Sequence, residues 1–287
     1  MTNCHLEIAQ DWTDSQCETF QTILAVFDLN VFLVKSVQVL IFSFLAFLLI
    51  SHSCKGNKSI GRLQIVTALL TVFQGIAAIV RTWAEFPIYS SKPKMKIYGV
   101  AIFADDVSFY SAVWLFSAML YESALDIESL LGKSNRQDTK KVKRNFNIAR
   151  VAGAGLIIFS HLPVLIPIFH IKISKETHQI LAGTSLGLLS VIVAGTAIFM
   201  TLAVQKLSKV AKIAFDSGLN PWLTTLYIFS SFVWALAWFI FLVLFLIYID
   251  DIDSYTPLLA LLTLYQITVN SVAVIFGIMA LIIFRSS

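Results

Sequence analysis

Seven stretches of mostly apolar residues run through the chain, and short polar segments separate them. Each stretch reaches the roughly 20 residues that an α-helix needs to cross the hydrocarbon core of a bilayer. The predicted spans cover residues 22–51, 62–84, 98–125, 149–171, 179–205, 221–249 and 256–284. No segment between them is long enough to bury a core of its own. We therefore predict a polar tail, residues 1–21, and one all-α transmembrane domain of seven helices, residues 22–287.

The composition agrees with this pattern. Hydrophobic residues make up 57% of the chain and charged residues 13%, with a mean hydropathy of +0.80. A water-soluble domain with this composition would expose large apolar patches. The first residues lack the basic and apolar regions of a cleavable signal peptide, so we expect the first span to act as its own signal anchor.

The distribution of lysine and arginine predicts the orientation, because basic residues in short loops stay in the cytosol. Fourteen of the 21 basic residues fall on the side that holds the C-terminal end and the loops after the first, third and fifth spans. Six fall on the other side, and Lys35 lies within a span. This count predicts an N-terminus outside the cytosol and a C-terminus inside it.

The three cysteines show neither the density of a disulfide scaffold nor the spacing of a metal site. Cys4 and Cys17 share the polar tail and can form a disulfide if the tail faces an oxidising compartment. Whether they are bonded stays open from the sequence. Cys54 falls on the opposite, cytosolic side.

Ionisable residues inside spans are costly and are therefore the first candidates for a functional site. Lys35 lies in the first span, Arg81 near the end of the second, and Asp105 with Asp106 early in the third. Given the predicted topology, all four lie in the outer third of the bilayer and can meet. They indicate either a polar ligand or ion site that opens outward, or structural ion pairs with the cations reaching the headgroups.

The outer half of the seventh span is unusually polar, so that side must face other helices. Its polar residues are Tyr265, Gln266, Thr268, Asn270 and Ser271. We expect Tyr265 and Asn270 to join the four charged residues in an outward-facing pocket.

A second candidate site lies at the inner end of the third span, where acidic side chains face the basic segment that follows. The residues are Glu122, Asp126, Lys140, Lys141, Lys143 and Arg144. They indicate either a contact site for a cytosolic signalling protein or solvated charges at helix ends. The basic strip 133–150 is too short and isolated to indicate nucleic-acid binding, and we expect it to attract anionic lipid headgroups.

Two further features lie within spans. His161 near Pro163 and Pro167 predicts a hydrogen bond between the imidazole and a carbonyl that proline frees, rather than a metal site. Gly183 and Gly187, with Gly195 two turns further on, form a small face that indicates close helix packing or, as the alternative, a homodimer.

Several classes of chemistry have no basis in the sequence. The seventh span has no lysine for a retinal Schiff base, and the chain has neither a glycine-rich phosphate loop nor residues arranged for an intramembrane zinc hydrolase. We therefore expect neither an enzyme nor a cofactor. The chain also lacks the usual motifs of rhodopsin-like receptors, and it shows no internal duplication of the kind found in many transporters.

Short motifs resemble the seven-span group that includes the plant tobamovirus-multiplication proteins and their animal orphan-receptor relatives. The motifs are Ala78-Ile79-Val80-Arg81-Thr82 with Phe86 after it, the stretch from Phe109-Tyr110 to Tyr121-Glu122, and the ending Leu281-Ile282-Ile283-Phe284-Arg285. The acidic residue and the proline expected in that group's last span are missing. The resemblance implies a receptor-like scaffold of endosomal or vacuolar membranes that recruits cytosolic partners. We expect the protein either there or in the plasma membrane.

Three hypotheses result. The first is a divergent receptor-like protein that binds a small ligand in an outer polar pocket and engages partners through its basic inner loops. The second is a scaffold or complex subunit without a ligand. The third is an ion or proton channel, or a transporter, that uses Asp105 or Asp106.

Overall fold

The computed structural model describes residues 12–54, 62–85, 92–130, 136–166, 174–211, 221–248 and 254–286. These residues form α1 Asp14–Cys54, α2 Arg62–Glu85, α3 Lys92–Leu130, α4 Arg136–Leu165, α5 Lys175–Ala211, α6 Pro221–Ile247 and α7 Tyr255–Ser286, with no strand among them. Each of the seven helices contains a window long and apolar enough to cross a membrane. The predicted all-α class and the seven membrane-length helices are confirmed.

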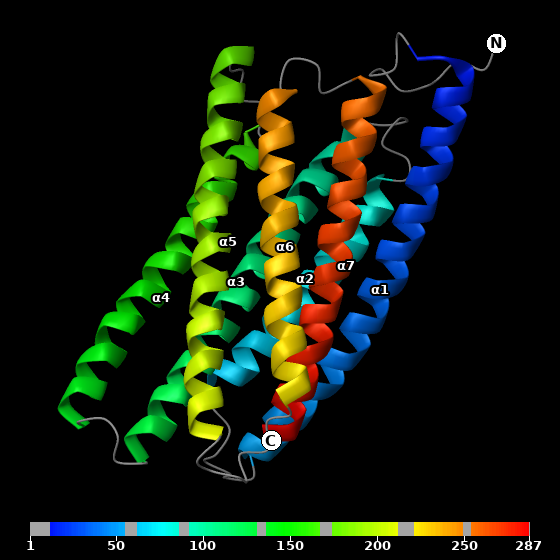
Figure 1. The fold of residues 1–287 in the computed structure, drawn as a ribbon. Helices are drawn as coiled ribbons and strands as arrows, with labels where there is room; N and C mark the ends of the chain where they lie inside the picture. Colours follow the sequence, from blue (N-terminus) through cyan, green and yellow to red (C-terminus); the bar gives the residue numbers. More distant parts are fainter. Residues whose placement is uncertain are drawn as a thin grey trace.

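The contacts between helices close a ring that leaves out α4, which lies at the edge of the bundle in Figure 1. In the ring α1 packs on α2, α2 on α3, α3 on α5, α5 on α6, α6 on α7, and α7 returns to α1. Helix α4, drawn in green at the edge of the bundle, packs against α3 and α5. The odd-numbered helices begin at one end, which we name the N-terminal end, and the chain finishes at the opposite end.

Helix α1 starts inside the predicted tail because a capping box fixes its first turn. The backbone amide of Gln16 donates to Thr13 Oγ1 at 3.3 Å, and the amide of Thr13 donates to Gln16 Oε1 at 2.9 Å. This reciprocal pair satisfies two amides that a helix start otherwise leaves without partners. Trp12, directly before the cap, packs against a small cluster of Cys17 and Phe20.

Helix α4 also differs from the predicted span. The basic segment expected as a loop is helical from Arg136, and Phe146 anchors it to the neighbouring helices. The Phe146 ring lies 5.0 Å from the Tyr121 ring of α3 and 5.4 Å from the Phe199 ring of α5. At the other end α4 finishes at Leu165, soon after Pro163, as expected where proline interrupts the hydrogen-bond ladder.

The small face of α5 meets the bundle at Gly195, where a Cβ atom would lie 3.7 Å from the Trp114 ring, but not at its other two glycines. A Cβ atom built on Gly183 or Gly187 would meet no described atom within 4 Å. The prediction of close packing at these glycines is therefore wrong for the part of the molecule described. The alternative, a homodimer through this face, stays a prediction.

The core fills the middle of the bundle and its half toward the C-terminal end. Its largest fully buried side chains include Phe42, Phe116, Trp234, Ile275 and Met279, which come from α1, α3, α6 and α7. Helix α3 has the largest buried share of any span, since it is in contact with helices on both sides. The bundle is hollow instead at its N-terminal end.

Candidate functional site

A cavity of about 560 Å³ lies at the N-terminal end between α1, α2, α3, α6 and α7. Small-molecule sites usually have volumes of about 300–1,000 Å³, so this cavity has the size of a ligand pocket. Apolar and aromatic side chains line most of it: Phe20, Leu24, Val31, Phe109, Tyr110, Trp238, Phe241, Phe245, Leu258, Leu261 and Leu262. Polar side chains gather on the walls that α1, α2 and α3 contribute.

Trp12 forms part of the wall near the start of α1. Its ring meets the Phe20 ring edge-on at 5.1 Å and the Tyr255 ring, at the start of α7, at 5.0 Å. The capping box of Thr13 and Gln16 fixes the backbone directly after Trp12. These three rings join the first and last helices at the N-terminal end.

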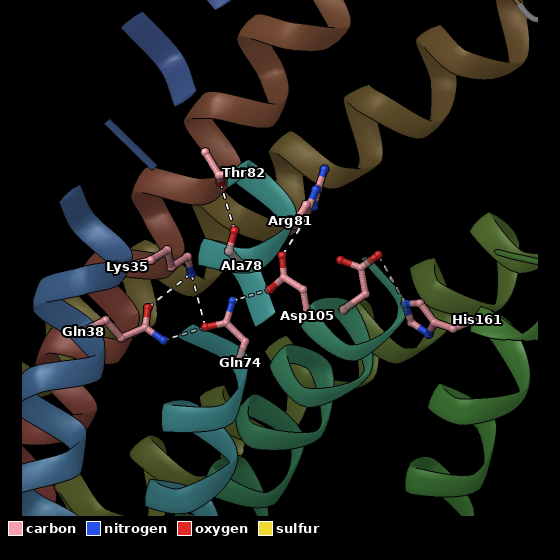
Figure 2. Close-up of polar contacts among 9 residues, drawn as sticks. Lys35, Gln38, Gln74, Ala78, Arg81, Thr82, Asp105 and His161 are labelled. Carbon is pink, nitrogen blue, oxygen red and sulfur yellow. Dashed lines mark hydrogen bonds and ion pairs between the residues drawn. The ribbon is translucent and has the colours of Figure 1, made fainter. Parts of the chain in front are cut away.

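A hydrogen-bonded chain of polar side chains links the first three helices, and we name it the α1–α2–α3 network (Figure 2). Lys35 Nζ donates to Gln38 Oε1 at 3.2 Å and to Gln74 Oε1 at 3.3 Å. Gln38 Nε2 donates to Gln74 Oε1, and Gln74 Nε2 donates to Asp105 Oδ1, each at 2.5 Å. Arg81 Nη1 completes the network 3.4 Å from Asp105 Oδ2. The Gln74 amide thus links Lys35 to the Asp105 carboxylate, and the Gln38 amide bonds to both Lys35 and Gln74.

Both cations of the network also lie over aromatic rings. Arg81 Cζ is 5.1 Å from the centre of the Tyr265 ring, and Lys35 Nζ is 5.7 Å from the centre of the Phe276 ring. Such contacts stabilise a cation that has left water. The Nε atom of Arg81 is buried and has no hydrogen-bond partner among the described residues.

The two neighbouring aspartates have different surroundings. Adjacent helix positions point about 100° apart, so Asp105 turns toward α2 while Asp106 turns toward the cavity and α4. The Asp105 side chain is 9% exposed and the Asp106 side chain 35% exposed. Asp106 Oδ2 lies 3.9 Å from His161 Nε2, which is beyond hydrogen-bond distance.

His161 has a backbone partner, as the sequence predicts, but not a carbonyl freed by proline. Its Nδ1 lies 2.7 Å from the carbonyl oxygen of Ile157, one turn earlier in α4. Because a carbonyl can only accept, Nδ1 carries the proton of this contact. His161 Nε2 is buried and has no hydrogen-bond partner among the described residues.

Gln266 of α7 adds an unsatisfied acceptor to the cavity. Its residue is 5% exposed, and its Oε1 atom has no hydrogen-bond partner in the described part of the chain. Buried polar atoms without partners are rare, because each costs about 1–3 kcal/mol. Among the described residues that line the cavity, Gln266 Oε1 and Arg81 Nε are the two buried polar atoms without a hydrogen-bond partner.

The structure brings together five of the six predicted pocket residues. Lys35, Arg81, Asp105, Asp106 and Tyr265 all line the cavity. Asn270 does not, because the buried stripe of α7 passes through Val269 and Val272 and turns Asn270 to the exposed face.

Sequence reasoning missed several residues of the site, and three of them carried a signal that could have found them. Asp28 lines the cavity and is an ionisable residue in the first span, so the rule that identified Lys35 also identifies it. Gln38 and Gln74 connect the charges and were detectable as amides inside apolar stretches.

The second candidate site is present in part. Glu122 pairs with Arg150 Nη1 at 3.6 Å and with Lys143 Nζ at 4.0 Å, and all three side chains are partly exposed. Lys141 and Arg144 are exposed on α4. The side chains of Asp126 and Lys140 lie outside those that the structure describes.

The cysteines differ in state. Cys17 is disulfide-bonded, and its partner lies outside the described residues, as Cys4 does. Cys54 is free and exposed at the other end of α1. In the described part of the chain no three His, Cys, Asp or Glu side chains are grouped so that they could hold a metal ion.

Comparison with known proteins does not assign this chain. The likeness to the tobamovirus-multiplication group rests on short motifs and stays a prediction. No model of a known protein family matches the chain, and a search of curated proteins finds no match.

Proposed function

We propose that this protein is a seven-helix receptor-like membrane protein that binds a small amphiphilic ligand in the cavity at its N-terminal end. The observation that carries the proposal is the buried, unpartnered Gln266 Oε1 in the lining of an otherwise largely apolar cavity. A ligand with a hydrogen-bond donor would satisfy this atom, and its apolar part would fill the aromatic section.

The position of Asp106 favours ligand binding over a purely structural role for the charges. A structural cluster would hold both aspartates in closed pairs with Lys35 and Arg81. Only Asp105 is held in this way, whereas Asp106 is partly exposed and lines the cavity.

The core below the cavity favours a receptor over a channel. In the described part of the bundle, Phe42, Phe116, Ile275 and Met279 are almost completely buried and fill the space toward the C-terminal end. An open ion path would need a water-filled passage there, and these side chains close it.

The rings of the cavity wall provide a connection to this core. Phe109 and Tyr110 line the cavity, and their rings lie 5.4 and 6.0 Å from the ring of buried Trp234 in α6. A ligand that displaces these two rings would change how α6 packs on α3. This is a route by which binding at one end would alter the other end, where the basic face of α4 is available to cytosolic partners or anionic headgroups.

We further propose that the cavity faces away from the cytosol. The disulfide at Cys17 and the free thiol of Cys54 support this orientation, since disulfides persist in oxidising compartments and are rare in the cytosol. The distribution of lysine and arginine supports it independently.

Cysteine labelling tests the orientation. A membrane-impermeant maleimide added to intact cells that express the protein is expected to leave Cys54 unlabelled, and to label it after the membrane is permeabilised. The variant Cys54→Ser provides the background signal. Labelling of Cys54 in intact cells would reverse the proposed orientation.

A cavity-filling variant tests ligand binding. The protein in lipid nanodiscs is titrated with the neutral naphthalene probe Prodan, and energy transfer from tryptophan is recorded, because Trp12 and Trp238 line the cavity. We expect a saturable signal, and we expect Ala78→Phe, which places a ring in the cavity, to weaken binding about tenfold or more.

Val80→Phe is the matched control, because Val80 lies on the exposed face of the same helix. It should bind the probe as the unmodified protein does. A signal that rises linearly and equally in all three proteins would indicate partition into lipid alone and would contradict the proposed function.

A further inference from the structure

Charged side chains of both signs line the cavity. Among the described lining residues they are the carboxylates Asp28, Asp105 and Asp106 and the cations Lys35 and Arg81. In a poorly solvated site a carboxylate is costly unless a cation or a proton neutralises it.

The two cations are already engaged. Lys35 donates to Gln38 and Gln74, and Arg81 pairs with Asp105 and lies over the Tyr265 ring. An anionic ligand would therefore compete for occupied cations and would also meet the Asp106 carboxylate. This arrangement disfavours an anion.

No donor of the described residues forms a hydrogen bond with the Asp106 carboxylate. His161 Nε2 lies 3.9 Å from its Oδ2 atom. With the Nδ1 proton directed at the Ile157 carbonyl, the neutral imidazole presents an acceptor to Asp106 rather than a donor. Asp106 Oδ2 and His161 Nε2 are thus two acceptors that face each other. A ligand group that donates hydrogen bonds would stabilise this arrangement.

Aromatic rings surround the same space. Tyr110, whose ring lies 5.4 Å from the His161 ring, and Trp238, 5.9 Å from Tyr110, both line the cavity. Their faces suit the apolar body of a ligand and also attract a cation. Gln266 Oε1 provides a second acceptor in the lining.

We propose that the ligand is an amphiphilic amine with a single positive charge, whose ammonium group pairs with Asp106 while its apolar body lies among the aromatic rings of the cavity. This inference rests on the proposed function, because it names the chemical class of the ligand for the same cavity.

Three compounds with the same apolar body and different charge test the proposal: 2,2-diphenylethylamine, 2,2-diphenylethanol and diphenylacetate. Each is used to displace Prodan from the protein in nanodiscs of uncharged lipid, so that lipid charge does not bias the comparison. A charge-assisted hydrogen bond predicts that the amine binds about 10- to 100-fold more tightly than the alcohol, and the acid most weakly.

Asp106→Asn is the decisive variant, because it removes the charge and keeps the shape. The amine should then bind only as well as the alcohol. Unchanged affinity for the alcohol would show that the cavity is intact. Asp14→Asn, in the first turn of α1 and outside the cavity lining, is the matched control and should keep the preference for the amine.

The possible failures are distinguishable. Equal affinities for the three compounds, tightest binding of the acid, an amine preference that survives in Asp106→Asn, or Prodan binding that none of the compounds displaces would each overturn the amine proposal and leave the proposed function standing. Equal affinities are also the result expected if a proton shared with His161 already neutralises Asp106. Absence of saturable binding by Prodan and by all three compounds would overturn the proposed function itself.

Discussion

Replacement of Asp105 by asparagine is expected to lower the free energy of unfolding by about 3–5 kcal/mol, the usual effect of removing one partner from a buried ion pair. Asp105 is the only carboxylate of the α1–α2–α3 network, and it accepts from Gln74 and pairs with Arg81. Without its charge, the buried Lys35 and Arg81 would have no counter-charge within the network. Denaturation of the purified protein, followed by circular dichroism, would measure the effect.

Asp106→Asn is the matched control on the adjacent position. Its side chain is 35% exposed and makes no recorded hydrogen bond, so we expect a change below about 1 kcal/mol. In the double variant Asp105→Asn with Arg81→Gln, part of the loss should be regained, because neither partner of the pair is then left charged alone. Equal destabilisation by the two single aspartate variants would contradict the different roles assigned to them.

Gly153→Ala is expected to destabilise the protein by about 1–3 kcal/mol through overpacking. A Cβ atom at Gly153 would overlap the indole of Trp114. That indole cannot move freely, because its Nε1 donates to the carbonyl of Arg150 at 3.1 Å and its far edge approaches Gly195 of α5. The same denaturation experiment measures the change.

Gly155→Ala, two residues further along α4, provides the comparison. A Cβ atom there would meet nothing within 4 Å, so only helix propensity should act, and it favours alanine by up to about 1 kcal/mol. If the two alanine variants unfolded alike, the contact between α4 and Trp114 would not have the role we assign to it.

The helices were predictable because a membrane span needs a long apolar run, and seven such runs are visible in the sequence. Their ends were less predictable, since they depend on local contacts. The start of α1 is written in the sequence as Thr13 followed three residues later by Gln16, a capping signal. The extension of α4 depends instead on Phe146 meeting rings of α3 and α5, which no local pattern reveals.

The site was predictable where charge alone identified its members. Lys35, Arg81, Asp105 and Asp106 stand out because ionisable side chains are rare in spans. The different surroundings of the two aspartates were not predictable. Which of them faces α2 and which faces α4 depends on how α3 is rotated about its axis. The same reason explains Asn270, whose exposure depends on the rotation of α7.

The α1–α2–α3 network has a consequence for biosynthesis, since its members all belong to helices that are synthesised before the other four helices of the bundle. Lys35 enters the bilayer with α1, but its carboxylate counter-charge arrives only with α3. A lone lysine in lipid is costly, so α1 should stay beside the insertion machinery until α3 has emerged, and the three helices should then be released together. The cavity needs α6 and α7 as well, so it is complete only when α7 is in place.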